Sequence, residues 1–485
     1  MTTYIFRRLL LMIPTLFGIS LVVWLVMALA PGRPGEDASS GFGQDKEDQS
    51  LGDPAKDAQK GQAQRIFRSQ YGLDRPRFYN DWDGLEADEL SPLIDDYRGK
   101  IEDVGAKAKR EAEWALEDYG YYAVPALIDL VQSTDGDKQS VVCYWLGRSA
   151  HRIVQKKSGQ ALTDADLTRI RAINVENAML STYQWERDAA PERRAEVVAQ
   201  WTSWFEKNKS RWDHSGWEKF KRSLTDTQFG VYWGRLLKGD LGESYTLKKP
   251  VLSLIGERLK YSLCLNVVAF LIAYMVAVPL GILTAVKQGT LIDRVIAIGL
   301  FMLYSLPNYF VATLLVRYLS VDAKIFPIEG FESENAAELN TWQHFKDVLW
   351  HITLPILCLS YGGLAFLSRF SRSGMLDVIR SDYIRTARAK GLSEWNVIFK
   401  HVVRNGILPV VTLLGTSLPV LISGSVAIEY IFDINGMGLL MIKSIFAKDY
   451  NVVMGVQLIV GILTMIGILL SDIAYAVLDP RISLS

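Results

Sequence analysis

Long apolar segments alternate with polar ones along this chain. About 20 helical residues cross the ~30 Å hydrocarbon core of a bilayer, and six segments approach or exceed that length. They are Leu9–Ala30, Ser262–Val286, Val295–Leu319, Val348–Leu367, Gly406–Ile428 and Val453–Leu478. The pattern predicts an all-α membrane protein with six spans.

The charges between these segments predict their orientation. Residues 369–405 carry eight Lys and Arg against three acidic residues, whereas residues 320–347 are rich in acidic residues. Basic loops stay in the cytoplasm, so both termini are expected to be cytoplasmic and the polar stretch 33–261 extracytoplasmic. The apolar segment after Arg7 and Arg8 exceeds the core of a signal peptide, which predicts an uncleaved first span.

The polar stretch has two parts of different character. Residues 35–61 are rich in Gly, Asp, Ser, Gln and Lys, which is typical of a flexible linker. Residues 83–225 are helical by pattern, and Ala-Val-Pro-Ala-Leu-Ile at 123–128 resembles the start of a HEAT-like repeat. Further helices are predicted over Lys138–His151, Thr163–Trp185 and Pro191–Asn208, the last with an apolar stripe of Val198, Trp201 and Phe205.

Seven tryptophans lie in this helical stretch. Aromatic side chains can form a ligand platform, but at helical spacing they more often form a core, which is the interpretation favoured here. The seven are Trp114, Trp145, Trp185, Trp201, Trp204, Trp212 and Trp217.

Composition excludes several classes of function. The formal net charge is zero, so nothing indicates a nucleic-acid partner, and three cysteines and five histidines show no metal-ligand spacing. No Gly-x-x-x-x-Gly-Lys-Ser/Thr loop, catalytic triad or carboxylate pair is present, so no catalytic residue, metal or cofactor is predicted. Charged residues near span ends, Arg317, Glu429 and Asp472, are interpreted as structural rather than as part of a translocation path.

The basic loop between the fourth and fifth apolar segments has an organised pattern. It predicts a short helix over Tyr383–Lys390, a break at Gly391 and a second helix from about Ser393. Such a helix outside the bilayer, joined to two spans, can transmit a push.

This loop resembles the cytoplasmic loop of ABC-transporter permeases that docks on the ATPase. Arg385-Thr386-Ala387 stands where that family has Glu-Ala-Ala, followed by Gly391 and Leu408-Pro409. The missing glutamate and the longer spacing resemble the dipeptide/oligopeptide permease subfamily. Further segments similar to that subfamily are Ala30-Pro31-Gly32, Gln70–Trp82, Phe229–Val251, Glu429–Gly455 and Asp472–Ile482.

The resemblance implies a transport subunit rather than an enzyme. It implies half of a peptide importer in the bacterial inner membrane, with a second homologous permease, two ATP-binding subunits and an extracytoplasmic solute-binding protein as partners. Its implied ATPase-coupling residues are Arg385, Thr386, Ala387, Gly391 and Leu392, while the substrate-binding residues stay unknown. Alternatives are a permease for nickel or another small solute, or a membrane-anchored sensor.

The helical stretch interrupts the family pattern, because the segments at 70–82 and 229–251 are nearly contiguous in relatives. We expect an inserted extracytoplasmic domain with neighbouring ends, serving either as a docking module or as a spacer. The expected divisions are residues 1–31 (first span), 32–82 (linker and family segment), 83–225 (insert), 226–261 (return segment) and 262–479 (permease core with five spans).

Overall fold

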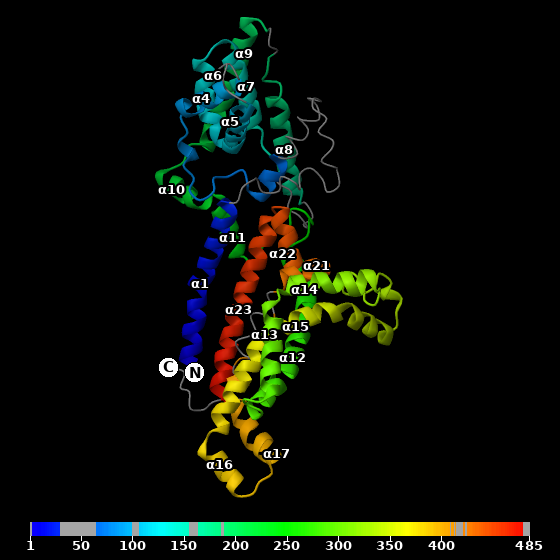
Figure 1. Ribbon diagram of the computed structural model, residues 1–485. Coiled ribbons are helices and arrows are strands. Elements are labelled where there is room, and N and C mark those ends of the chain that lie inside the picture. The colour runs from blue at the N-terminus through cyan, green and yellow to red at the C-terminus, as the bar shows by residue number, and fades with distance from the viewer. Residues whose placement is uncertain are drawn as a thin grey trace. The chain divides into compact units, whose positions relative to one another are not determined.

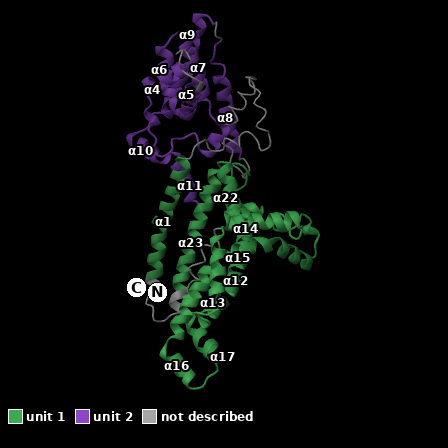
Figure 2. Ribbon diagram, viewed as in Figure 1, with its two compact units in different colours: residues 1–31, 241–485 green, residues 32–240 purple. Residues whose placement is uncertain are grey.

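The structure, a computed structural model, consists of helices joined by turns and loops in its described part. It describes residues 2–29, 65–98, 106–154, 163–185, 189–407, 409–411, 413, 421 and 424–478. The expected linker 35–61, the Ala30-Pro31-Gly32 motif and the chain after residue 478 lie outside the described residues. The chain divides into two compact units, residues 1–31 with 241–485 and residues 32–240 (Figure 2).

The first unit is built from long apolar helices (Figure 1). α12 packs along α15 over much of its length, and α1 packs against α23. The longer helices of this unit are α1 (Thr2–Leu29), α12 (Val251–Val286), α13 (Leu291–Ser305), α15 (Thr341–Ile379) and α23 (Tyr450–Leu478). Shorter ones are α14 (Asn308–Leu315), α16 (Asp382–Ala389), α17 (Glu394–Asn396), α18 (Arg404–Gly406), α21 (Val426–Ile431) and α22 (Met437–Phe446).

Within the described residues, four helices are long and apolar enough to cross a membrane, namely α1, α12, α15 and α23. A fifth span is present if α13 and Asn308–Asp322, which meet at 88°, count as one. Of the 23 residues of the predicted span Gly406–Ile428, 11 lie outside the described residues. Several apolar helices are therefore present, while the sixth span stays a prediction.

The predicted span Val295–Leu319 is not one straight helix. α13 ends at Ser305 and Pro307 forms the N-cap of α14, where the chain turns by 88°. Proline fixes its own φ and has no N–H to donate, which explains a sharp break at this point. Beyond the break, α14 and the first part of α15 project sideways as an antiparallel pair (Figure 1).

Small residues allow α12 and α15 to approach closely. Ala269, Ala273, Ala277, Gly281 and Ala285 recur at every fourth position of α12, and all are buried. A Cβ atom on Gly281 would lie 2.6 Å from the Cβ atom of Ser371 on α15. Helices in lipid gain little from burying large apolar groups against each other, so close backbone contact supplies van der Waals attraction instead.

The second unit consists of shorter helices around an aromatic core. They are α4 (Ala87–Arg98), α5 (Ala106–Tyr119), α6 (Val124–Ser133), α7 (Gly136–Ala150), α8 (Asp164–Leu180), α9 (Pro191–Asn208), α10 (Gly216–Thr225) and α11 (Gln228–Leu236). α6 and α7 pack against each other across a two-residue connection. Leu127, Trp145, Leu146 and Trp201 are buried in this core.

Local sequence signals predict four of these helices, α6, α7, α8 and α9, although α8 ends at Leu180 rather than at the predicted Trp185. Thr163 caps α8 in a capping box with Asp166, and Pro191 starts α9 at the predicted residue. The apolar stripe of α9 is shifted from the prediction. Trp201 is buried as expected, but the other buried positions are Val197 and Trp204, while Val198 and Phe205 are only partly buried.

The tryptophans mostly belong to the core, as the sequence indicates. Trp145, Trp201 and Trp204 are buried, and Trp185 and Trp212 pack against them. The interpretation is wrong for Trp114 and Trp217, both of which are exposed. Trp217 stacks on Phe220 at the surface of α10, with ring centroids 5.7 Å apart.

The two ends of the helical stretch lie side by side, as predicted. Asn80 N donates to Ser223 O at 2.9 Å, and Gln228 N donates to Pro76 O at 2.9 Å. Gln228 Nε2 also donates to the carbonyl oxygen of Arg75 at 2.7 Å. The chain therefore leaves and re-enters the surrounding segment at one place, which is the geometry that domain insertion requires.

Candidate functional site

The basic loop of the first unit folds into a helix with a defined C-terminal cap. Gly391 has φ +76°, and its N–H donates to Arg388 O at 2.9 Å. The next N–H, from Leu392, donates to Ala387 O at 3.4 Å. These two bonds form a Schellman motif, which needs a residue in the left-handed region and therefore favours glycine.

The second short helix, α17, is held against α16 by side-chain hydrogen bonds. Ser393 caps α17, and Arg388 donates from Nε and Nη2 to the two carboxylate oxygens of Glu394 at 2.9 and 3.3 Å. Such a bidentate pair fixes direction as well as distance. Tyr383 at the start of α16 accepts a hydrogen bond from Asn405 Nδ2 at 3.1 Å. These hydrogen bonds give the loop a defined conformation.

Apolar contacts anchor this loop on the long helices. Ile384 and Ala387 of α16 join Val397 and Val402 in a buried cluster with Met375 of α15 and Ala285 of α12. Glycines permit a tight crossing next to it, because a Cβ atom on Gly374 would lie 2.6 Å from Gly406 O. α16 is thus packed directly on α12 and α15.

The five residues that sequence resemblance implicates occupy different environments. Arg385, Thr386, Gly391 and Leu392 are exposed, whereas Ala387 is buried beneath α16. Arg385 lies 3.6 Å from Asp382 in an exposed ion pair, and Thr386 Oγ1 donates to Asp382 O at 3.0 Å. Exposed ion pairs of this kind hold little energy, so the Arg385 guanidinium is available to an external partner.

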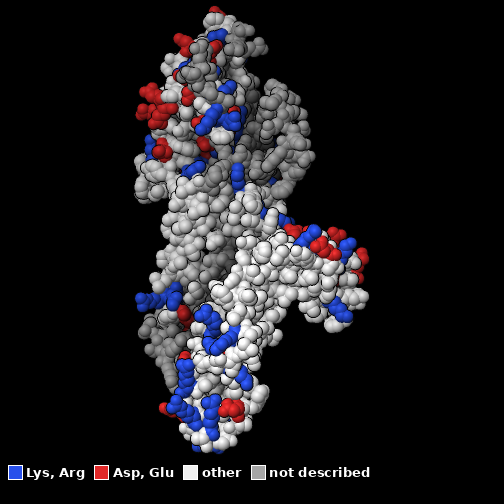
Figure 3. Space-filling view, in the orientation of Figure 1, with Lys and Arg blue, Asp and Glu red and all other residues white. Residues whose placement is uncertain are grey.

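The sequence analysis did not predict a functional role for three aromatic side chains on this loop. Tyr383, Trp395 and Phe399 are exposed, and the rings of Trp395 and Phe399 are 4.0 Å apart. The sequence feature that could have revealed them is the presence of large aromatic residues within a strongly charged loop. Solvated loops rarely expose aromatic clusters without a partner. Figure 3 shows Lys and Arg gathered at the α16 and α17 end of the first unit.

Comparison with known proteins then identifies the family. Residues 277–484 match the family described as binding-protein-dependent transport system inner membrane component. The chain is 41% identical over 266 residues to an oligopeptide transport system permease, AppB, of Bacillus subtilis, which covers 54% of this chain and 83% of that protein. It is also 33% identical over 314 residues to the dipeptide transport system permease DppB of Escherichia coli, covering 61% and 87%.

The chain belongs to the dipeptide/oligopeptide family of ABC-transporter permeases. A third relative, the inner membrane ABC transporter permease YejB of Escherichia coli O157:H7, is 37% identical over 269 residues, 54% of this chain and 73% of its own. The family match lies within the first unit of the permease and does not extend over residues 32–240.

A buried carboxylate organises the opposite end of this permease unit. Glu429 of α21 is 1% exposed and accepts hydrogen bonds from Ser262 Oγ at 2.8 Å and Leu439 N at 3.0 Å. Ser262 Oγ in turn accepts from Met437 N at 2.8 Å. The carboxylate therefore ties α12, α21 and α22 together, which supports its structural interpretation.

A second buried carboxylate holds the segment that precedes α12. Asp449 is fully buried and accepts hydrogen bonds from Ser244 Oγ at 2.6 Å and Thr246 N at 3.2 Å. Asn451 donates to Glu243 O at 2.9 Å beside it. The polar return segment is thus pinned to the start of α23, which sequence reasoning did not anticipate because the partners are some 200 residues apart.

The remaining charged residues near span ends are also structural. Asp472 pairs with Arg8 at 3.0 Å and accepts from Tyr4 Oη at 2.8 Å, which joins α23 to α1. Arg317 lies 3.3 Å from Asp322. Among the described residues of the permease, no group of three or more His, Cys, Asp or Glu side chains could hold a metal ion.

Proposed function

We propose that this permease is one half of the translocation path of an ATP-driven importer of dipeptides or oligopeptides. The names of its relatives, which are oligopeptide and dipeptide transport permeases, support the substrate class. The observation that carries the mechanism is the rigid loop of α16 and α17, exposed on one side and packed on α12 and α15 on the other.

In this proposal, α16 docks in a cleft of an ATP-binding subunit. Arg385, Thr386 and Leu392 supply contacts, and the exposed rings of Tyr383, Trp395 and Phe399 extend that surface. Ala387 faces inward, so it acts by holding α16 on the long helices, and Gly391 acts by permitting the cap. Closure of the ATPases would then move α12 and α15 as one body.

The assembly in this proposal has six spans per permease and a bacterial inner-membrane location, with both termini in the cytoplasm. A second homologous permease completes the path, which Ser262–Val286 and Gly406–Ile428 line on this side. Two ATP-binding subunits drive it, and an extracytoplasmic solute-binding protein delivers the peptide. Reporter fusions after Asp135 and after Ser393 test the topology, and signals from the same side of the membrane contradict it.

The second unit, in this proposal, is an extracytoplasmic domain that docks the solute-binding protein. Its buried core supports independent folding, and α6 with α7 supplies the single HEAT-like pair. Replacing residues 83–225 by a short Gly-Ser linker should preserve assembly with the ATPases and weaken uptake at limiting peptide. Unchanged uptake under that condition leaves a spacer role and removes the docking role.

The decisive test of coupling is Gly391→Val. A branched side chain at φ +76° strains the cap without touching a neighbour, because a Cβ atom there has no other atom within 4 Å. The variant should reach the membrane but hydrolyse ATP without importing peptide, or fail to bind the ATPase. Gly289→Val is the matched control, since Gly289 has φ +79° and an equally open site in the turn between α12 and α13.

Substrate class is tested separately in a strain that lacks this gene. Growth on short peptides as the only source of an auxotrophic amino acid should be lost and restored by the wild-type gene. Retained peptide uptake with loss of nickel uptake overturns the peptide assignment while leaving the permease family intact.

A further inference from the structure

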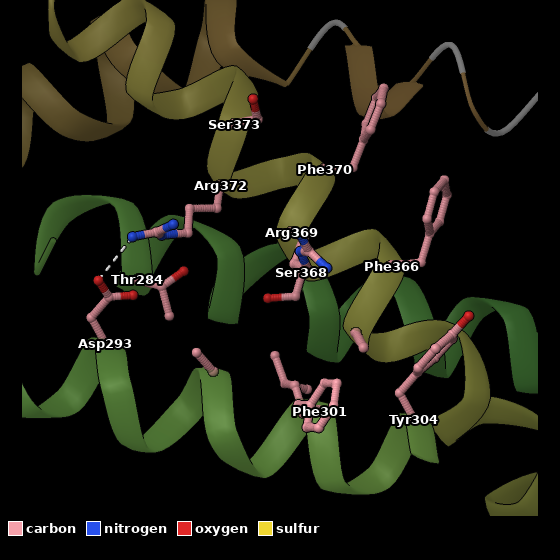
Figure 4. Close-up of a pocket in the computed structure, with 13 residues that line it drawn as sticks. Thr284, Asp293, Phe301, Tyr304, Phe366, Ser368, Arg369, Phe370, Arg372 and Ser373 are labelled. Carbon is pink, nitrogen blue, oxygen red and sulfur yellow. Dashed lines mark hydrogen bonds and ion pairs between the residues drawn. The ribbon is translucent and has the colours of Figure 1, made fainter. Parts of the chain in front are cut away.

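A cavity of about 570 Å³ lies between α13 and α15, with α12 behind it (Figure 4). It is separate from the loop and from the two buried carboxylates, and of its lining only Thr284 belongs to a segment that is proposed to line the translocation path. Its lining includes Thr284 of α12, Asp293, Phe301 and Tyr304 of α13, and Arg369 and Arg372 of α15.

The polar end of this cavity has an excess of positive charge. Arg372 Nη2 pairs with Asp293 Oδ2 at 2.8 Å, and among the described lining residues no second carboxylate faces the guanidinium of Arg369. Arg369 has no hydrogen bond or ion pair to any residue that the structure describes. Arg372 Nε is buried and also lacks a partner within the same described residues.

Asp293 is not free to neutralise both arginines. Its Oδ2 also accepts a hydrogen bond from Gly289 N at 3.0 Å, and Asp293 is itself buried at the start of α13. The carboxylate is therefore committed to closing the α12–α13 turn and to orienting Arg372. A buried donor without an acceptor is costly, so an added anion would satisfy Arg372 Nε, and it would also neutralise the exposed guanidinium of Arg369.

The other side of the cavity is apolar and open. Phe301 is 68% exposed, and Tyr304, Phe366 and Phe370 are also exposed along the same opening. In Figure 4 the two arginines lie on α15 facing α13, while Phe366 and Phe370 point away from Asp293. A ligand that fills this site needs an anionic head and an apolar tail.

The position of the cavity along its helices suits a ligand with an anionic head and an apolar tail. Arg372 lies seven residues before Ile379, where α15 ends, which is roughly 10 Å along a helix axis. Asp293 is equally near the start of α13, just after the turn from α12. The C-terminal end of α15 and the N-terminal end of α13 both lie on the side of the basic loop. In the proposed topology, the polar end of the cavity therefore falls at headgroup level in the cytoplasmic leaflet.

We propose that this cavity binds an anionic phospholipid of the cytoplasmic leaflet. The phosphate lies between Arg369 and Arg372 Nε, and the acyl chains run along Phe301, Phe366 and Phe370. Basic pockets between helices on the cytoplasmic side are suited to such headgroups, and adjacent aromatic rings suit the glycerol and upper acyl region. The inference depends on the proposed topology and is independent of the transported solute.

The test uses the purified full transporter in a neutral detergent, with phosphatidylglycerol as the probe. Phosphatidylglycerol should raise the thermal unfolding midpoint and be retained in native mass spectra, whereas phosphatidylcholine should do neither. Arg369→Gln should weaken phosphatidylglycerol binding about tenfold, as expected for one charge-assisted hydrogen bond.

Two variants on the same helix control the comparison. Arg380→Gln removes the exposed arginine at the C-cap of α15, 11 residues after Arg369 and outside the cavity lining, and this variant should bind as the wild type does. Arg369→Lys keeps the charge and should retain most of the binding even if Arg369→Gln impairs folding. Equal binding by the Arg369→Gln and wild-type transporters overturns the proposal.

Free phosphate is the competing source of the same anion. If inorganic phosphate raises the unfolding midpoint as much as phosphatidylglycerol does, and does so through Arg369, the site is not a lipid site. Failure of peptide uptake has no bearing on either result, so the lipid inference and the transport proposal can fail separately.

Discussion

The two units of this permease differ in how many of their large apolar side chains are exposed. In the first unit, the α12–α15 contact includes a row of alanines with Gly281, while Met275 of α12 is 70% exposed. In the second unit, Trp145 and Trp201 are buried at the centre. Each unit has the organisation suited to its solvent, because lipid accepts large apolar groups and water does not.

Polar groups differ between the units in a corresponding way. In the second unit, ion pairs such as Arg148–Glu117 and Arg211–Glu176 are partly buried. In the first unit, carboxylates such as Glu429 and Asp449 are buried and accept several hydrogen bonds each. The residues that stabilise one unit therefore differ in kind from those that stabilise the other. The following substitutions test this difference.

The largest effect is expected for Trp201→Ala in the second unit. Trp201 is fully buried and donates from Nε1 to Tyr183 O at 2.9 Å. Its loss should lower the free energy of unfolding of a 65–240 fragment by about 3–5 kcal/mol in urea titrations. Trp217→Ala, at an exposed position, should change it by less than about 0.5 kcal/mol. Equal effects would show that the aromatic core is not where the structure places it.

A smaller but clear effect is expected where α12 meets α15. Gly281→Val brings a side chain to within 2.6 Å of Ser371 Cβ, and overpacking of this kind costs about 1–3 kcal/mol. The full-length variant should lose thermal stability in detergent. Gly299→Val on α13, where a Cβ atom has no neighbour within 4 Å, should not. A tolerated Gly281→Val would mean that small residues do not set the distance between these helices.

Capping of α8 should contribute about 1 kcal/mol to the second unit. Thr163→Ala removes the side chain that accepts from Asp166 N at 3.2 Å and leaves that donor unsatisfied. Thr168→Ala inside the same helix should be neutral or slightly stabilising, because alanine is the better helix former. The difference in the free energy of unfolding between the Thr163→Ala and Thr168→Ala fragments, measured by urea titration, gives the contribution of the cap. Equal values would contradict a stabilising cap at Thr163.

The smallest effect concerns pH and His151 in the second unit. Burial lowers the pKa of His151, partly opposed by its hydrogen bond to Asn177 O at 3.1 Å. The unfolded chain then binds a proton more readily than the folded one. Stability should be unaffected by His151 above its ordinary pKa of about 6.5 and should fall as the pH drops below it.

His151→Gln isolates this contribution. Unfolding midpoints of the 65–240 fragment, measured from pH 7.5 to pH 5, should decline less steeply for His151→Gln than for the wild type. Parallel curves would show that His151 is protonated as easily in the folded domain as in the unfolded chain.

The sequence carried the local information on both units well. Thr163 and Pro191 mark helix starts, Gly391 marks the end of α16, and the apolar segments mark most of the long helices. Span boundaries were less accurate. α15 continues twelve residues past the predicted Leu367, since its later turns still pack on other helices although they carry charge.

By itself, then, the sequence determined the helical class, the family and the position of the loop that we propose for coupling. These follow from hydrophobic periodicity, caps and ordered motifs, all of which act over a few residues. Only the tertiary structure decided that Pro307 redirects a predicted span, that Asp449 holds Ser244, and that Arg369 and Arg372 line one cavity. Those outcomes depend on which distant side chains meet, and that is set by the packing of whole helices rather than by local preference.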